Sequence, residues 1–437
     1  MKHSFSDLAA LGRDPLQLFL DKSEENSKLV KMRIGLSPVY MLNDAALIKP
    51  LLKADESEFG KGRFIKKFEA MLGVTTLTLN GEEYKRRRDV HHEYFTRGLR
   101  QNFASEICAV IRQHAAEYAK ETSFDVFETM QPLILRVISA IIFGHNTLSA
   151  SDENILIDAV HNIEKDLADS FFQILPDWPW IRHRKKQRLK ASRRAMTYVV
   201  EKVLKNATSS RLVHALAEIG LTPEEINNEI LLLFLGGHQT MGGAATWLLY
   251  SLAIDPQLCE RVAQEALQMS GSAGEIDPHQ LPQAKLSLNI VREILRLYPS
   301  FHWFSRETKR DTEFAGITLR KGTSIIISNW MFHRSPRYWD EPDAFRLNRD
   351  YGTPAYIPFG AGPRACIGMG LSMLELQLLA LELASAFDFK ILSEVPAARP
   401  RISISMLPPP IRLQLKPRQT PTQPQGFAEE RQSALVD

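Results

Sequence analysis

The chain has 437 residues, of which 24% are charged and 44% hydrophobic, the composition of an ordinary globular protein. Its formal net charge of +3 is too small to indicate a polyanionic partner by itself. Its three cysteines, Cys108, Cys259 and Cys366, are far apart, which argues against a disulfide framework and favours a reducing compartment. Charged residues interrupt the first twenty positions, so we expect neither a signal peptide nor a membrane span there. We therefore expect a cytoplasmic protein.

Helical periodicity dominates the chain, and no internal repeat is evident. Residues 103–121 and 125–144 are predicted to form consecutive helices, because their apolar residues recur at helical spacing. Few stretches have the alternating pattern of strands. The chain is thus predicted to be mainly α-helical, with small β-sheets.

A long helix is predicted within residues 221–255. Thr222 has the position of an N-cap, Pro223 that of the first helical residue, and Glu225 completes a capping box. The rest of this stretch is largely apolar, which predicts a helix buried on all sides.

Short strands are predicted near both ends of the chain. One covers residues 39–44, and residues 316–329 resemble a hairpin with its turn at Lys321–Gly322. A C-terminal pair is predicted at 401–406 and 411–417. From Pro417 onward the chain is rich in Pro, Gln and Thr, which favours a disordered tail at 417–437 after one domain of residues 1–416.

The segment "PFGAGPRACIGMG", residues 358–370, has two interpretations. Gly360, Gly362 and Ala365 match the spacing of a dinucleotide-binding fingerprint, with Glu382 as the distant acid. That fingerprint requires a βαβ unit, whereas Glu382 lies within a helical pattern. We consider this interpretation weak.

The second interpretation centres on Cys366. A cysteine at the start of an apolar helix is close to the positive helix end, which favours the thiolate. Glycines at 360, 362 and 368 permit a flat group to approach, and Arg364 can bind a carboxylate. Together these features suit a haem with a sulfur ligand. Most single cysteines are small core residues, but the dense spacing from Phe359 to Gly368 argues against that here.

This segment resembles the haem-ligand signature of the cytochrome P-450 family, the haem-thiolate monooxygenases. Further matches in the family's order cover nearly the whole chain: "EILR" (293–296), "EPDAFRLNRD" (341–350), "GGHQT" (236–240) and "GEEYKRRR" (81–88). The resemblance implies a single helix-rich triangular prism, haem b as cofactor and Cys366 as its iron ligand, in the manner of the family's soluble bacterial members.

The resemblance also implies an ion network. Glu293 and Arg296 are three residues apart on one helix face, and Arg346 is expected to complete their network. Such a pair is often a weak surface contact. The apolar neighbours instead favour burial and a structural role in holding the ligand loop.

The expected catalytic residues are Thr240 and Gln239. Glycines at 236 and 237 weaken a helix interior, either for close packing or because the helix opens over the haem. By resemblance, the Thr240 hydroxyl would hold a proton beside the oxygen that the haem activates. Gln239 replaces the family's usual acid and cannot release a proton, so a carboxylate relay is in doubt. His238 is expected to be an ordinary packed or solvent-facing residue.

Arg88 and Arg306 are expected to bind the haem propionates with Arg364, and Tyr84 occupies the place of a family Trp or His. Phe359 and Gly368 complete the expected cofactor site. Residues 301–304 are aromatic and either line the substrate pocket or pack against helices.

The expected substrate is a lipophilic small molecule: a fatty acid, a terpenoid or an aromatic compound. No reductase domain is recognisable, so a separate ferredoxin or flavodoxin-type protein would donate electrons. A peroxide-rearranging or peroxygenase enzyme and a non-catalytic haem protein remain alternatives. The basic run at 182–194 is interpreted as a solvated helix face rather than a nucleic-acid site.

Overall fold

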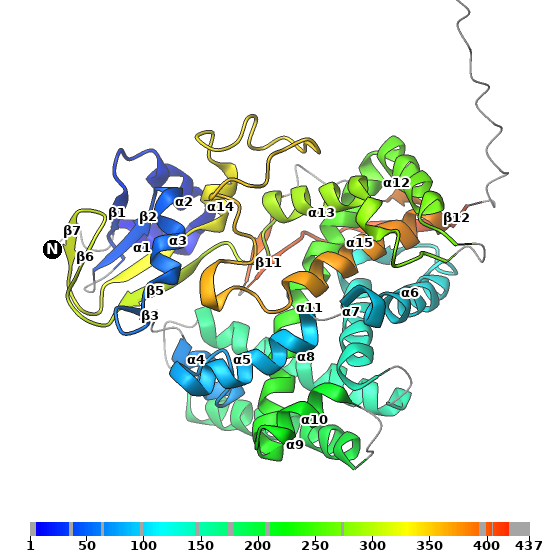
Figure 1. Cartoon of the computed structure of the whole chain (residues 1–437), viewed down its shortest axis with the longest axis horizontal. Helices are drawn as coiled ribbons and strands as arrows, with labels where there is room; N and C mark the ends of the chain where they lie inside the picture. The colour runs from blue at the N-terminus through cyan, green and yellow to red at the C-terminus, as the bar shows by residue number, and fades with distance from the viewer. Residues whose placement is uncertain are drawn as a thin grey trace, which may run out of the picture.

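The computed structural model describes residues 6–34, 38–62, 65–96, 99–144, 148–172, 178–205, 210–271, 275–392, 399–403 and 405–418. Helices make up most of this part of the chain, as expected (Figure 1). The α-helices are α1 (Ser6–Arg13), α2 (Pro15–Ser23), α3 (Ile48–Lys53), α4 (Ile65–Leu72), α5 (Gly81–Thr96), α6 (Leu99–Tyr118), α7 (Val126–Phe143), α8 (Ala150–Phe172), α9 (Pro179–Leu204), α10 (Arg211–Glu218), α11 (Pro223–Ile254), α12 (Pro256–Gln268), α13 (Lys285–Leu297), α14 (Asn329–Arg334) and α15 (Met369–Ala386).

The strands are short and form small sheets, the largest in the order β1-β2-β8-β5-β3. This sheet lies at one side of the molecule with α1 to α3 and α14 (Figure 1). The strands are β1 (Leu29–Met32), β2 (Val39–Leu42), β3 (Phe59–Lys61), β4 (Phe124–Asp125), β5 (Phe304–Thr308), β6 (Thr312–Phe314), β7 (Ile317–Leu319), β8 (Ser324–Ile327), β9 (Phe387–Ile391), β10 (Arg401–Ile402), β11 (Met406–Leu407) and β12 (Arg412–Pro417).

Two large hydrophobic cores correspond to these two parts. One is built around α6, α7, α11 and α15, and the other lies under the five-stranded sheet. α11 passes through the middle of the helical part, beside α7 and α15 (Figure 1). Burial of these apolar faces supplies most of the stabilisation, since helix propensity alone is a weak term.

The long helix begins as predicted. The Thr222 hydroxyl accepts from the Glu225 amide, and the Glu225 carboxylate accepts from the Thr222 amide at 2.9 Å. Most of α11 is buried, but a strip around Gly236 and Thr240 is exposed or half-buried. The prediction that this helix is buried on all sides is therefore wrong for this strip, which belongs to the candidate site.

Two predicted strand pairings are wrong. β7 pairs with β6, whereas β8 pairs with β2 and β5, so the segment 316–329 crosses between two sheets instead of forming a hairpin. At the C-terminus, β10 pairs with β11, while β12 pairs with β9 and β4. Alternation revealed the strands but carried no information about their partners.

The predicted C-terminal tail mostly lies outside the described residues, from 419 onward. Pro417 ends β12, and the Arg418 amide donates to the Ala386 carbonyl at 2.9 Å. Within the described residues, α7 and α15 are long and apolar enough to cross a membrane by length and composition. Burial of 78% and 61% of these windows matches core helices instead.

Candidate active site

The loop before α15 folds back so that it presents Cys366. The Cys366 amide donates to the Phe359 carbonyl at 2.9 Å and closes the loop. Gly362 has φ of 74°, and a Cβ there would lie 2.7 Å from the Leu52 carbonyl oxygen of α3. Any side chain would push the loop away from α3, which explains the glycine.

The Cys366 side chain differs from the other two cysteines. Cys108 and Cys259 are buried, whereas Cys366 is exposed. Protein atoms nevertheless crowd its sulfur, and this burial raises the pKa of the thiol. The Gly368 amide and Arg88 offset part of this rise. The backbone N–H at the helix start thus favours the thiolate, as expected, but burial outweighs its effect on the pKa in the polypeptide alone.

Helix α5 holds the loop from one side. The Tyr84 hydroxyl donates to the Pro363 carbonyl at 2.6 Å, and Arg88 Nη2 donates to the Ala365 carbonyl at 2.7 Å. Their spacing of four residues places both side chains on one helix face. Both predicted residues thus reach the loop that carries Cys366.

Three cations lie together beside this loop. The Arg364 guanidinium lies 3.3 Å from the centre of the Tyr84 ring, and Arg364 Nε donates to Glu56 at 2.5 Å. The pairing of β3 with β5 places Lys61 opposite Arg306. Burial and the charge of Arg364 lower the pKa values of both, that of Lys61 to about 7.

This cation cluster, Lys61, Arg306 and Arg364, has a surplus of positive charge. Glu56 forms an ion pair with Arg364, and Arg306 hydrogen-bonds the Ser305 carbonyl at 3.1 Å. Partly buried cations that depress one another's pKa values are stabilised by nearby anions. Two carboxylates, such as haem propionates, suit this need. Sequence reasoning missed Lys61, because a lone lysine in a short strand has no distinguishing pattern.

A strip of α11 forms another part of the site. Gly236 is exposed, and a Cβ built there would meet nothing within 4 Å. The Thr240 hydroxyl donates to the Gly236 carbonyl at 2.7 Å, and the Ser300 hydroxyl donates to the Thr240 carbonyl at 3.1 Å. The helix continues without a break, so the expected opening is wrong. Free space instead comes from the missing side chain at Gly236.

The neighbours of Thr240 have separate contacts. Gln239 Oε1 accepts from the buried Ser405 hydroxyl at 3.5 Å. His238 is buried and lies 2.8 Å from a Glu164 carboxylate oxygen. This makes His238 a packed residue, one of the two outcomes expected, with a carboxylate partner from α8 that the sequence did not indicate.

The Glu293–Arg296 pair is fully buried and well connected. Two hydrogen bonds of 2.8 Å join the side chains, and Arg296 also donates to three backbone carbonyls: His333, Pro342 and Ala344. Burial alone would raise the pKa of Glu293, but Arg296 and its other donors outweigh burial and lower it. Charges in such surroundings require complete pairing.

The prediction that the Arg346 side chain is the third member of this network is wrong. Its side chain pairs with Glu341 at the surface, and only its backbone amide reaches Glu293, at 2.9 Å. The guanidinium partner is Arg349, whose Nε donates to Glu293 at 2.9 Å. Tyr351 adds a hydrogen bond of 3.0 Å. Both arginines occur in one short segment, and spacing did not indicate which of them turns inward.

The weak alternative with a dinucleotide fingerprint finds no support. Glu382 lies inside α15, where its carboxylate accepts two hydrogen bonds from Arg112 at 2.9 and 3.0 Å. No strand leads directly into the glycine-rich loop, and β9, which follows α15, pairs antiparallel with β12, so the βαβ context is missing from this described region.

The aromatic segment 301–304 leads from α13 toward β5. Phe301 is 40% exposed, His302 is buried, and Trp303 and Phe304 are half-buried. Burial lowers the pKa of His302 to about 4, so this imidazole is neutral near pH 7. The role of these residues in a substrate pocket stays a prediction.

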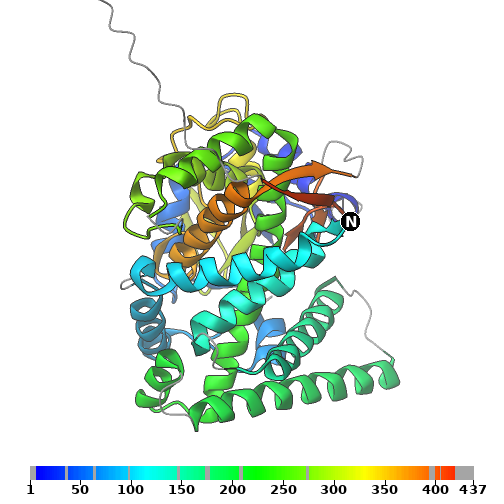
Figure 2. The ribbon, with the colours of Figure 1, turned by 90° about the vertical axis from the view of Figure 1, so that its right-hand side faces the viewer.

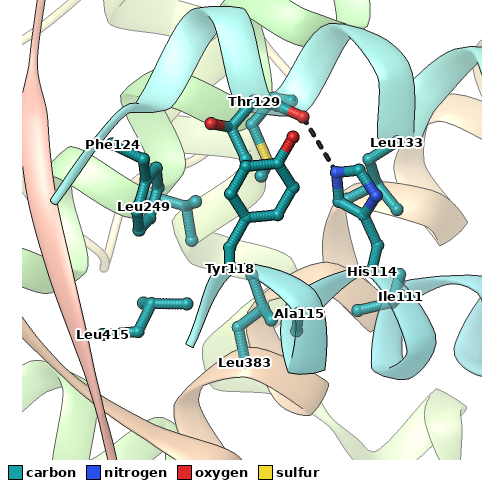
Figure 3. A pocket seen from close by; sticks show the side chains of 11 residues that line it. Ile111, His114, Ala115, Tyr118, Phe124, Thr129, Leu133, Leu249, Leu383 and Leu415 are labelled. Atoms are coloured by element: carbon teal, nitrogen blue, oxygen red, sulfur yellow. Dashed lines mark hydrogen bonds between the residues drawn. The ribbon is translucent and has the colours of Figure 1, made fainter. Parts of the chain in front are cut away.

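A small cavity lies elsewhere, between α6, α7 and α15 (Figure 3). Its lining is apolar apart from a few groups such as His114, which hydrogen-bonds the Thr129 carbonyl at 3.0 Å. None of the predicted site residues lines it. We interpret it as a packing defect of the helical core rather than a ligand site.

Comparison with known proteins supports the assignment of this site. The sequence model of the family "Cytochrome P450" matches residues 8–415. The chain belongs to the cytochrome P450 family. It is 24% identical over 421 residues to human "Cytochrome P450 4V2", covering 83% of this chain and 78% of that protein. It is 25% identical over 414 residues to "Cytochrome P450 714C3" of Oryza sativa subsp. japonica, covering 88% and 78%. It is 29% identical over 214 residues to "Cytochrome P450 3A40" of Oryzias latipes, covering 47% of this chain and 43% of that protein.

Membership of this family establishes the class of enzyme and its cofactor. The protein is an oxidoreductase of the haem-thiolate monooxygenase type, and haem is its cofactor. The helix-rich fold with small sheets agrees with the family. The cation cluster, the exposed Cys366 thiol and the open side of Gly236 also suit a flat cofactor with two carboxylates. When bound, haem supplies the capacity to activate oxygen.

Proposed function

We propose that this cytochrome P450 inserts one oxygen atom from O2 into a lipophilic small molecule, such as a fatty acid, a terpenoid or an aromatic compound. Cys366 would be the iron ligand, and Tyr84, Arg88, Arg306 and Arg364 would hold the propionates. Phe359 and Gly368 would shape the ligand loop. The observation that carries this proposal is the exposed Cys366 thiol in a loop held by Tyr84 and Arg88.

Two residues of α11 would assist the reaction. The Thr240 hydroxyl can hold a proton at the strip left open by Gly236. Gln239 can accept a hydrogen bond but cannot release a proton, so its amide would orient a neighbour or water. Proton supply would then pass through Thr240 and solvent.

We further propose that a separate ferredoxin or flavodoxin-type protein donates the electrons and that the protein works in the cytoplasm. Residues 1–416 would form the haem domain, together with Pro417, the last residue of β12. The chain's three widely spaced cysteines agree with a reducing compartment.

The iron ligand can be tested by spectroscopy. The ferrous carbonyl complex of the purified protein should show the far-red-shifted Soret band of thiolate ligation, and Cys366→Ala should lose it. Cys108→Ala is a matched control, because Cys108 is buried in the helical core. Retention of the band in Cys366→Ala would show that another residue binds the iron.

The reaction class can be tested with added redox partners. A monooxygenase should consume reduced nicotinamide in proportion to product when a suitable lipophilic compound is present. Turnover of an organic peroxide without any reductase would indicate a peroxide-rearranging or peroxygenase enzyme instead. Ligand binding without either turnover would indicate a non-catalytic haem protein.

A further inference from the structure

Glu229, near the start of α11, is a fully buried carboxylate that the proposed reaction does not use. From α5, Arg87 Nη1 and His91 Nε2 each lie 3.2 Å from one of its oxygens. From the loop between α4 and α5, the Thr76 amide and hydroxyl donate to it at 2.8 and 2.9 Å. These four groups pair both carboxylate oxygens, so removal of the carboxylate would leave buried donors without an acceptor.

Glu229 is too far along α11 from the expected catalytic residues to act on a substrate directly. Thr240 follows it by eleven residues, which corresponds to roughly 16 Å along the helix axis. Figure 2 shows α11, in green, rising from the lower edge of the molecule through its middle. Any role of Glu229 in the reaction must therefore be carried by the residues that it holds.

The loop that Glu229 contacts, segment 75–80, lies against the cation cluster. It contains no helix or strand. Arg364 donates to the Thr76 and Leu79 carbonyls at 3.3 and 2.8 Å, and Lys61 Nζ donates to the Leu79 carbonyl at 2.6 Å. The backbone of this segment thus fixes the positions of two of the three cations.

Segment 75–80 is a closed turn that moves as one unit. The Thr78 and Leu79 amides both donate to the Thr75 carbonyl at 2.9 Å, and the Thr75 amide donates to the Thr78 hydroxyl at 2.9 Å. Within such a turn, a hold on Thr76 also fixes the Leu79 carbonyl. One buried carboxylate can therefore set the position of both carbonyls that the cations use.

The contacts form a closed circuit beside the cysteine loop. Thr76 joins Glu229 to Arg364, with its amide on the first and its carbonyl on the second. The Arg364 guanidinium lies over the Tyr84 ring, and Tyr84 is three residues before Arg87 on α5. Arg87 contacts Glu229 and so completes the circuit. A cation held in this way has little freedom left to lose when it binds an anion.

We propose that Glu229 is a positioning residue that holds segment 75–80, and through it Lys61 and Arg364, in place for the haem propionates. The inference rests on the proposed binding of the propionates by Arg364. Cations that are fixed before haem arrives lose little side-chain entropy on binding, which strengthens the hold on the cofactor. Without the Glu229 contacts the segment would move, the cations would move with it, and haem would dissociate faster.

The test is transfer of haem from the full-length holoprotein to an excess of apomyoglobin. Glu229→Gln should release haem roughly tenfold faster or more, because an amide cannot accept all four hydrogen bonds. The matched control is Glu225→Gln. Glu225 also accepts from Arg87, at 2.6 Å, but its other described partner is Thr222 at the start of α11 rather than segment 75–80. Glutamine keeps the capping box, so this variant should release haem at the wild-type rate.

Hydrogen exchange locates the effect within the holoprotein. The amides of segment 75–80 should lose protection in Glu229→Gln and keep it in Glu225→Gln. Equal haem release from the two variants would overturn the proposal. Faster release from Glu229→Gln with segment 75–80 still protected would also overturn it, because general loosening would then be the cause.

Thr76→Val provides a second measurement that changes no charge. It removes the hydroxyl bond to Glu229 and keeps that of the Thr76 amide. Haem should dissociate about threefold faster. Its reduction potential should become more negative, because propionate charge that the cations compensate less well favours oxidised iron. A purely structural threonine would leave the potential unchanged, and that result would overturn the proposal even if Glu229→Gln does not fold.

Arg364→Met separates this inference from the proposed function on which it rests. Release of haem at the wild-type rate from Arg364→Met would show that the proposed propionate site is wrong, and the role of Glu229 would fall with it. Fast release from Arg364→Met together with wild-type release from Glu229→Gln would overturn the positioning role alone. Fast release from both variants, with segment 75–80 unprotected in Glu229→Gln, is the expected result.

Discussion

Thr240 and Thr246 illustrate how two identical side chains on one helix can differ in what they can do. Each hydroxyl donates to the carbonyl four residues earlier, at 2.7 Å, so both form the same local hydrogen bond. Thr246 is fully buried, whereas Thr240 is half-buried beside Gly236. Only Thr240 can exchange its hydrogen bond for one with a substrate or water.

This contrast defines a prediction for catalysis. Thr240→Ala should retain haem and bind substrate but lose coupling, so product per electron should fall roughly tenfold or more while peroxide rises. Thr246→Ala should leave coupling unchanged. Product, peroxide and nicotinamide consumption are measured together. Equal coupling in wild type and Thr240→Ala would exclude a proton-holding role, and a faster Gln239→Glu would show that the amide limits proton supply.

Glu375 is a second residue whose surroundings decide its behaviour. It lies inside α15 and is buried, with no hydrogen-bond partner for Oε1. Burial raises the pKa of this carboxyl from 4.5 to about 8, so it carries a proton at neutral pH. The folded protein binds this proton up to a higher pH than the unfolded chain does.

A pH dependence of stability follows from that difference. The stabilisation by this proton is complete below pH 4.5 and disappears as pH rises through about 8, with a slope of up to about 1.4 kcal/mol per pH unit. Glu375→Gln should remove this slope and be more stable than the wild type above pH 8. Urea unfolding across pH measures it, with exposed Glu121→Gln as the control. A slope that Glu375→Gln leaves unchanged would contradict a protonated Glu375.

Helices were predictable from the sequence where local rules determine them. The capping box at Thr222 and the apolar period of α7 and α11 act within a few residues, and the structure agrees with them. Strand pairing depends on contacts between distant residues, such as β3 with β5. The register that brings Lys61 opposite Arg306 therefore had no local signal.

Prediction of the candidate site from the sequence has the same limit. Motif spacing identified the residues around Cys366, because glycines and the cysteine must have fixed relative positions. It did not distinguish Arg349 from Arg346, since the direction of a side chain depends on how the segment turns against α13. Arg349 has a side chain only 6% exposed, whereas that of Arg346 is 51% exposed.

Separate substitution of these two arginines provides a matched test of how the segment after α14 packs against α13. Arg349→Met would leave the buried Glu293 carboxylate with one fewer cation and should cost about 3–5 kcal/mol of unfolding free energy. Arg346→Met should change stability by less than about 0.5 kcal/mol. Urea unfolding and haem content are the measurements. Arg349→Lys, which retains the charge, should be intermediate, and equal effects at 346 and 349 would contradict the network described here.

At the scale of the whole molecule, the surface that a partner protein would meet at α5 carries both basic and acidic side chains. Lys85 pairs with Glu82 at 2.6 Å, and Arg86 pairs with Glu83 at 2.9 Å. Arg87, in contrast, is buried and contacts Glu229. Two of the three cations before Arg88 therefore remain for an encounter with a donor protein.

Substitution of Lys85 and Arg86 tests where an electron donor docks. Arg88 of the same helix contacts the loop of Cys366, so a donor near α5 would be close to the iron ligand. Lys85→Glu/Arg86→Glu also removes the partner of Glu82 and leaves Glu83 with Arg87 alone, which makes this face strongly acidic. An acidic ferredoxin should then reduce the variant at least tenfold more slowly at low salt, with the difference shrinking as the Debye length falls to about 10 Å at 0.1 M. Stopped-flow reduction across a salt series measures the rate, and substrate affinity should stay unchanged. The Lys49→Glu/Lys53→Glu variant reverses two exposed lysines of α3 and so controls for net charge. The same salt dependence in all three proteins would place the docking surface away from α5.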